Sequence, residues 1–312
     1  MFTLSDRRDF LRLCTSGAVG LCVPIFVRGQ SGQASLQALK LSDNLILISG
    51  AGANVVLVVG PDGLAMVDGG LPEHSAELFS LVSEQGHANP VKVLFNTNWH
   101  LEHTGSNEAL AKAGAKIVAH ANTRKWLKTR VLVELQNRTF APRPPEAIPT
   151  ETFYTTGKMT LGPVPIEYGH LGFGNSDGDI YVFFPESNIM VVSDILRAGQ
   201  YPFMDYNTGG WMGGMEEATY VLNKMVDAET RIVPALGALQ TRQDLKAEHD
   251  MIATVRDRIV AMLTKGLGYS EIVAAAPTKE FDARYGQPDQ FVTSAYRGIM
   301  RNLHETGVRF RD

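Results

Sequence analysis

The chain has 312 residues, of which 44% are apolar and 20% are charged, and its formal net charge is −4. These values are ordinary for a globular protein and exclude a collagen-like, coiled-coil or disordered chain. Lysine and arginine gather on no single stretch of the sequence, which argues against a nucleic-acid-binding surface.

Residues 1–34 are predicted to form an export segment. Paired arginines, Arg7 and Arg8, precede a short apolar run from Leu11 to Val27. This pattern resembles a twin-arginine signal peptide. We expect cleavage after Ala34, a periplasmic or secreted bacterial protein, and no stable membrane insertion afterwards. A retained N-terminal anchor is the alternative.

Both cysteines, Cys14 and Cys22, lie within this export segment. The mature protein is therefore expected to lack disulfides, thiolate ligands and a cysteine nucleophile. The twin-arginine route carries folded proteins, often because a cofactor is loaded first. A metal inserted in the cytoplasm would fit that route.

The mature chain begins with apolar strands and helices in alternation. The spacing of apolar residues predicts strands over 44–48, 53–59, 64–68 and 91–95, a turn at 61–63, a helix over 74–84 and another beginning near 107.

The second half of the chain repeats this theme and ends in helices. Strands are predicted over 165–168, 179–184, 189–192 and 231–234, a helix over 215–227, and helices over 242–302 with breaks at 266–268 and 285–288. Two β-rich halves with flanking helices predict two sheets packed face to face inside helical layers. We expect one domain over 35–245 and a C-terminal helical extension over 246–312.

A cluster of metal-ligand residue types follows the strand predicted at 91–95. His100, Glu102 and His103 lie within four residues. Because a strand end fixes the backbone, such a cluster can hold a divalent metal. The alternative is a polar turn leading into a helix, with Thr104 or Ser106 near its N-cap.

The run NTNWHLEHTGSN, residues 96–107, resembles the signature of the metallo-β-lactamase fold superfamily, usually written NTHWHxDHTGGN. Further landmarks of that family follow in the same order: Asp68 at an early strand end, the turn at 175–179, Asp194 after the strand at 189–192, and residues 232–237. The resemblance covers essentially the whole mature chain. It implies an α/β (α+β) fold, a four-layer αβ/βα sandwich, with a metal pocket at the sheet edges.

The departures from the family fall on its metal ligands. Where three histidines hold one metal, this chain has Asn98, His100 and Asn175; where the second metal binds, it has Glu102, His103 and Leu236, with Asp194 as the bridging aspartate. An amide oxygen is a weak ligand and leucine is none. The resemblance therefore implies at most one metal, held by His100, Glu102, His103 and Asp194, with Asn98, Asn175 and Leu236 as substituted positions lining the pocket.

Two functions remain open at this point. With one divalent metal (Zn, Mn or Fe), the protein would be a metal-dependent hydrolase of an ester, amide or phosphoester, in which Asp194 or Glu102 orients the attacking water. With no metal, a proton or the imidazolium of His100 or His103 must neutralise the two carboxylates. The protein would then be a pseudoenzyme or a small-molecule binding protein that has lost its zinc centre.

Residues outside the ligand set receive more modest interpretations. We expect His170 to be structural or merely beside the pocket, and His120 to be a surface or core-edge residue. The loop over 199–212 is expected to form either a substrate wall or ordinary packing. Trp99 and Trp211 are the candidates for an aromatic lining of the pocket.

Overall fold

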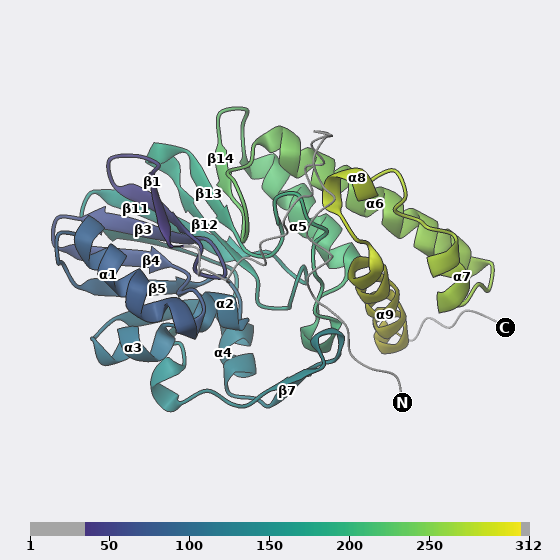
Figure 1. Cartoon of the computed structure of the whole chain (residues 1–312), viewed down its shortest axis with the longest axis horizontal. Coiled ribbons are helices and arrows are strands. Elements are labelled where there is room, and N and C mark those ends of the chain that lie inside the picture. The colour runs from purple at the N-terminus through teal and green to yellow at the C-terminus, as the bar shows by residue number, and fades with distance from the viewer. Residues whose placement is uncertain (1–34, 307–312) are drawn as a thin grey trace, which may run out of the picture. The chain divides into compact units, whose positions relative to one another are not determined.

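Two β-sheets lie face to face in residues 35–306, the part of the chain that the structure, a computed structural model, describes (Figure 1). The export segment predicted at 1–34 lies outside the described residues. Within residues 35–306, the helices are all too short or too polar to cross a membrane.

The first sheet has seven strands, and its parallel part carries functional residues. Its order is β1-β2-β3-β4-β5-β6-β9, antiparallel from β1 to β4 and parallel from β4 to β9. Parallel strands end at the same edge of a sheet. The strands span β1 (Gln37–Lys40), β2 (Leu45–Ser49), β3 (Val55–Gly60), β4 (Gly63–Val67), β5 (Val91–Asn96), β6 (Lys116–His120) and β9 (Glu151–Phe153).

The second sheet has five strands in the order β10-β11-β12-β13-β14, of which only β13 and β14 pair in parallel. They span β10 (Thr156–Leu161), β11 (Val164–His170), β12 (Ile180–Phe184), β13 (Ile189–Val192) and β14 (Arg231–Val233). A short ribbon pairs β7 (Val131–Val133) with β8 (Arg138–Phe140).

Three apolar clusters divide the fold into four layers. The cluster between the sheets joins side chains such as Val56 and Phe95 from the first sheet to Val182 from the second. Leu78 and Leu110 of α1 (Ser75–Gln85) and α3 (Asn107–Lys112) cover the outer face of the first sheet. The outer face of the second sheet packs on α5 (Met212–Met225), α6 (Arg242–Thr264) and α9 (Asp289–Thr306). This arrangement confirms the predicted αβ/βα sandwich.

The structure also contains elements that the sequence pattern did not predict. These are β1, β7, β8, β9, β10 and the short helices α2 (Leu101–Thr104), α4 (Ala121–Leu127), η2 (Pro72–His74), η3 (Glu134–Gln136), η4 (Pro145–Ala147), η5 (Pro185–Ser187) and η6 (Tyr206–Thr208). Most have only three or four residues, too few for a periodic apolar pattern.

The C-terminal part of the chain is helical, as expected. The helix α6 begins at Arg242, where Thr241 and Asp244 form a capping box, and it continues to Thr264. After α6 come α7 (Tyr269–Ala274), α8 (Asp282–Tyr285) and α9.

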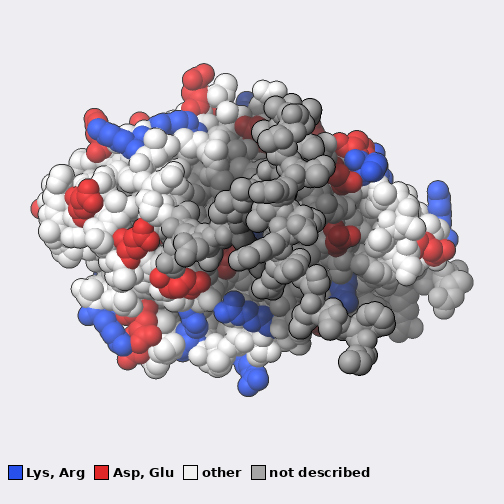
Figure 2. All heavy atoms as spheres, viewed as in Figure 1, with Lys and Arg blue, Asp and Glu red and all other residues white. Residues whose placement is uncertain are grey.

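Charged side chains are mixed in sign on the face shown in Figure 2. Among the described residues of that face, lysines and arginines lie close to aspartates and glutamates. Mixed surface charge of this kind is usual for a soluble domain.

A candidate active site at the parallel strand ends

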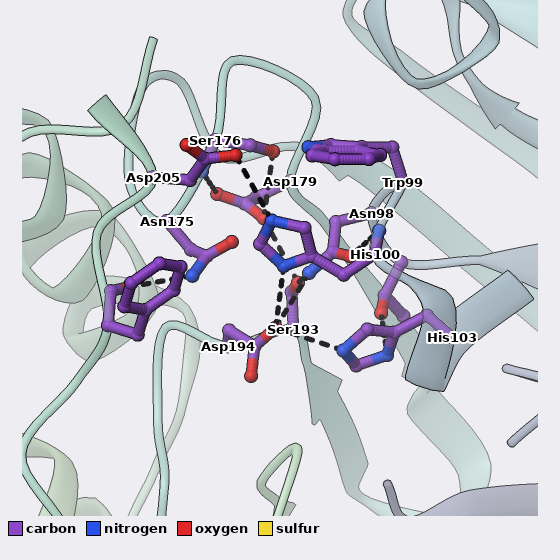
Figure 3. A network of polar contacts seen from close by, with 12 residues as sticks. Asn98, Trp99, His100, His103, Asn175, Ser176, Asp179, Ser193, Asp194 and Asp205 are labelled. Carbon is purple, nitrogen blue, oxygen red and sulfur yellow. Dashed lines mark hydrogen bonds and ion pairs between the residues drawn. The ribbon is translucent and has the colours of Figure 1, made fainter. Parts of the chain in front are cut away.

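The predicted metal-ligand residues come together where strands of both sheets end (Figure 3). Asp68 directly follows β4, and Asn98 and His100 lie between β5 and α2. The helix α2 carries Glu102 and His103, while Asp194 follows β13 from the second sheet. The site thus depends on both halves of the fold.

His103 lies between two carboxylates. Its Nδ1 is 2.8 Å from Oδ2 of Asp68, and its Nε2 is 2.9 Å from Oδ2 of Asp194. Since both ring nitrogens face a carboxylate oxygen, both carry a hydrogen and the ring is an imidazolium. Asp68 has a positive φ of 67° and also accepts hydrogen bonds from the backbone and hydroxyl of Thr97. The strained backbone of Asp68 is held by these contacts.

His100 is buried beside two other carboxylates. Its Nε2 is 3.3 Å from Oδ2 of Asp205, and its Nδ1 is 3.6 Å from Oδ2 of Asp194. The ring of Trp99 packs edge-on against the imidazole, with 4.8 Å between the ring centroids. Asp205 in turn accepts a hydrogen bond from Thr208. The position of His100 is therefore set from three sides.

Asp194 is the centre of the cluster and has several donors from the protein. Asn98 donates through Nδ2 to Oδ2 of Asp194 at 2.9 Å and to the hydroxyl of Ser193 at 2.8 Å. The guanidinium of Arg197 donates to Oδ1 of Asp194 at 3.1 Å. With His103 on Oδ2 as well, both carboxylate oxygens are engaged by the chain itself.

These contacts set the charges of the buried groups. Burial alone would lower the pKa of His100, but hydrogen bonds to Asp194 and Asp205 raise it to about 10. Burial is likewise outweighed at His103, whose pKa is raised by the charges of Asp68 and Asp194. For Asp194, burial would raise the pKa, yet His103, His100 and Arg197 hold it well below its usual range. The cluster is ionised at neutral pH.

Two polar groups of the site are less engaged. Asn175 donates from Nδ2 to the carbonyl of Phe203 at 2.7 Å, but its buried Oδ1 has no partner within residues 35–306. Figure 3 shows that oxygen directed toward His100. Glu102 is half-buried. One possible metal-ligand atom from each of His100, Glu102 and Asp194 lies within 4.8 Å of the other two. That group of three could hold one cation.

The remaining sequence-predicted residues differ in whether they contact this cluster. Leu236 is half-buried and forms a parallel backbone bridge with Arg197. Trp99 contacts His100, whereas Trp211 lies beside Gly298 of α9. His120 and His170 stack on each other with 3.8 Å between ring centroids.

Sequence reasoning missed three residues that contact the cluster. Arg197 stands three residues after Asp194, so a search for basic neighbours of each acidic candidate would have found it. Asp68 was noted only as a strand-end landmark, not as a partner of His103. Asp205 lies in a loop, and no local pattern places its side chain against His100.

Comparison with known proteins points to one family. The family model described as the metallo-beta-lactamase superfamily matches residues 49–238. A metallo-beta-lactamase from Pontibacter korlensis is 19% identical with a TM-score of 0.56, over 70% of this chain and 99% of that chain. The DIM-1 metallo-beta-lactamase is 16% identical with a TM-score of 0.57, over 71% of this chain and 98% of that chain. At such identities the two solved structures establish a shared fold.

Proposed function

Because the chain belongs to the metallo-beta-lactamase superfamily but has other residues at the ligand positions, we propose that it binds a small molecule without a zinc pair. The observation that carries this proposal is the ion pair between Arg197 and Asp194. A fixed guanidinium on the central carboxylate supplies the positive charge that a metal would otherwise supply.

The donor chemistry of the site does not fit two zinc ions. Asn98 presents its amide nitrogen to Asp194, and both nitrogens of His103 face carboxylates. In this arrangement the imidazolium of His103 has no free lone pair, the amide oxygen of Asn98 accepts a hydrogen bond from the backbone N–H of His100, and Leu236 has no ligand atom in its side chain. In this arrangement Asn98, His103 and Leu236, three positions of the family's ligand set, are thus not available to coordinate a metal.

Three of the four carboxyl groups of the cluster are paired with basic groups of the protein, and Glu102 is the fourth. Three carboxyl groups face three basic groups, namely Asp68, Asp194 and Asp205 against His100, His103 and Arg197. A buried charge is stable only when it is paired and hydrogen-bonded. Protein groups meet that requirement for Asp68, Asp194 and Asp205, so a cation is not needed to hold these three carboxylates together.

Glu102 is the member of the cluster best placed to meet a ligand. It is half-buried, and its carboxyl makes no hydrogen bond within residues 35–306. A carboxylate accepts hydrogen bonds only. We propose that Glu102 binds a donor group of the ligand above a rigid polar floor formed by His100 and Asp194.

A second candidate function is a hydrolase with one metal. The close approach of His100, Glu102 and Asp194, together with the unpartnered oxygen of Asn175, favours it. These residues would hold one divalent ion, which supplies Lewis-acid activation of water and of an ester, amide or phosphoester. In that case Asp194 or Glu102 would orient the water.

Elemental analysis by plasma mass spectrometry of protein purified from metal-supplemented cells separates the two functions. The binding function predicts far less than one metal atom per chain and the same melting temperature with and without a chelator. One tightly held atom per chain, lost in Glu102→Gln and kept in Glu108→Gln, would establish the single-metal function instead. Glu108 pairs with Lys112 on α3, away from the cluster, which makes it a matched control.

We also propose that the protein acts in the periplasm or outside the cell. The paired arginines Arg7 and Arg8 before an apolar run support this location. Replacement of both by lysine should keep the protein in the cytoplasmic fraction. Unchanged export of that variant would reject the twin-arginine route.

A further inference from the structure

A cavity of about 200 Å³ lies beside the cluster, between the loop after Asp194 and the turn that joins α8 to α9. The loop contributes Gln200 and Phe203 to its lining. The C-terminal extension contributes Tyr285, Gln287, Gln290 and Phe291. The cavity therefore exists only because the extension packs against the loop.

The walls of the cavity are fixed by Tyr201. Its ring stacks on Phe291, with 4.7 Å between centroids and 14° between planes. Its hydroxyl donates to Oδ1 of Asp282 at 2.9 Å, and its backbone N–H donates to the carbonyl of Tyr285 at 3.3 Å. A pocket with walls tied down in this way is preformed, so a ligand loses little free energy in ordering it.

The lining of the cavity carries no charged side chain. Gln200, Gln287 and Gln290 are exposed, and their side-chain amides make no hydrogen bond within residues 35–306. Tyr285 is 5% exposed, and its hydroxyl interacts with the buried carboxyl of Glu248. Free amides next to aromatic rings suit a ligand with both hydrogen-bonding and apolar surface, and they discriminate against an ion that would lose its hydration.

Phe203 connects the cavity to the buried cluster. Its ring lines the cavity and lies 6.1 Å, between centroids, from the ring of His100. Its carbonyl accepts the hydrogen bond from Asn175. A molecule in the cavity would thus lie one side chain away from His100.

We propose that this cavity binds a small uncharged molecule with a flat apolar face and hydroxyl or amide groups at its edge. The apolar face would pack on the partly exposed ring of Phe203, and the polar edge would bond to the glutamine amides. A sugar ring and an aromatic amide share this chemistry. This inference rests on the proposed binding function, because it names the class of ligand that would bind. The residues that line the cavity hold no metal in either candidate function.

The test is a titration of the full-length protein with benzamide, methyl β-glucoside and benzoate, followed by saturation-transfer NMR. At least one neutral probe should bind with a dissociation constant on the order of millimolar, as expected for so small a molecule. Benzoate, which matches benzamide in shape but carries a charge, should bind at least tenfold more weakly. Binding of methyl β-glucoside would indicate a sugar ring as the ligand, and binding of benzamide would indicate an aromatic amide.

Two variants place the bound probe in this cavity. Phe203→Leu removes the flat aromatic surface and should raise the dissociation constant of the neutral probe about tenfold. Gln290→Arg adds a cation at the exposed edge of the cavity, so benzoate should then bind at least as tightly as benzamide. Gln136→Arg, on the exposed helix η3, is the control and should not change the binding of benzoate.

The proposal is overturned if neither neutral probe binds, if benzoate binds as well as benzamide to the unmodified protein, or if Phe203→Leu and Gln290→Arg behave like the control. None of these results depends on metal content. Failure of this inference is therefore distinguishable from failure of the proposed metal-free function, which the elemental analysis decides.

Discussion

Two pairs of histidines lie at strand ends of this fold, and they are in opposite charge states. His100 and His103 face carboxylates, and their pKa values are raised. His120 and His170 stack on each other at 3.8 Å with 5° between the rings, and their pKa values are lowered. Both pairs are largely shielded from water, so burial alone does not explain the difference.

The partners of the imidazole rings explain it. The stacked rings each direct Nε2 at a backbone carbonyl, that of Tyr154 for His120 and that of Asp177 for His170. A carbonyl accepts a hydrogen bond but brings no countercharge, so burial and the neighbouring ring keep His120 neutral and lower its pKa to about 4. In the cluster around Asp194, nearby carboxylates raise the pKa values of His100 and His103 by more than burial lowers them. One residue type thus serves as a cation in one place and as a neutral support in another.

The largest expected effect comes from removing the anion that holds the charged pair. Asp194→Asn leaves His103 and Arg197 facing an uncharged amide in a buried site. Breaking a buried ion pair from one side destabilises a protein by about 3–5 kcal/mol. Urea unfolding should show a loss of that size, whereas Asp62→Asn on the exposed turn after β3 should show almost none. A loss below about 1 kcal/mol would mean that the cluster is not ionised as described.

A smaller effect is expected when the internal cation is removed. Arg197→Met should cost about 1.5–3 kcal/mol, because Oδ1 of Asp194 loses its charge-assisted hydrogen bond. Asp194 belongs to the group of possible metal ligands with His100 and Glu102. Added zinc should therefore raise the melting temperature of this variant but not that of the unmodified protein. If zinc stabilises both equally, Arg197 does not take the place of a metal.

The two pairs also predict opposite pH dependences. His100 has a folded pKa of about 10, above its ordinary value of 6.5, so its contribution to stability is complete below pH 6.5 and is lost as pH rises toward 10. His120 has a folded pKa of about 4, so its contribution is complete above pH 6.5 and is lost as pH falls toward 4. Stability should thus fall on both sides of neutral pH.

A variant of the stacked pair isolates the acid side of this profile. His170→Phe keeps a flat ring against His120 but removes one titrating group and the hydrogen bond to Asp177, at a cost of roughly 1 kcal/mol at pH 7. Chemical unfolding at pH 7, 5.5 and 4.5 should show a shallower loss in acid than in the unmodified protein. The alkaline side should be unchanged, since Asp68, Asp194 and Asp205 remain around the other pair. An equal slope in acid would assign the loss to Asp177, Asp179 or other groups.

The sequence predicted the scaffold of this site better than its chemistry. Strands such as Ile189–Val192 follow apolar runs bounded by turn residues, and the order of landmarks implied the sandwich that the structure contains. The grouping of His100, Glu102 and Asp194 follows from the same landmarks. Short elements such as β7 and β9 escaped prediction because three residues carry no usable period.

The contacts that set the charges could not be read from the sequence in the same way. The pairing of His100 with Asp205 joins residues more than a hundred positions apart, and the stacking of His120 on His170 joins strands of different sheets. Such contacts depend on how loops close over the strand ends, which apolar periodicity does not encode. Arg197 is the exception, since it follows Asp194 closely enough to be found by inspection.

The smallest expected effect is the most discriminating one for the role of Arg197. Leu236 stands where the family has its late histidine, and its backbone pairs with that of Arg197. Leu236→His restores the ligand type at a half-buried position and should change stability by only about 0.5 kcal/mol. It should bind no zinc by itself, because Arg197 still engages Asp194. Combined with Arg197→Met it should bind zinc more tightly than Arg197→Met alone, as measured by competition with a chromophoric chelator. Zinc binding by the single Leu236→His variant would show that the missing histidine, and not the internal cation, keeps the metal out.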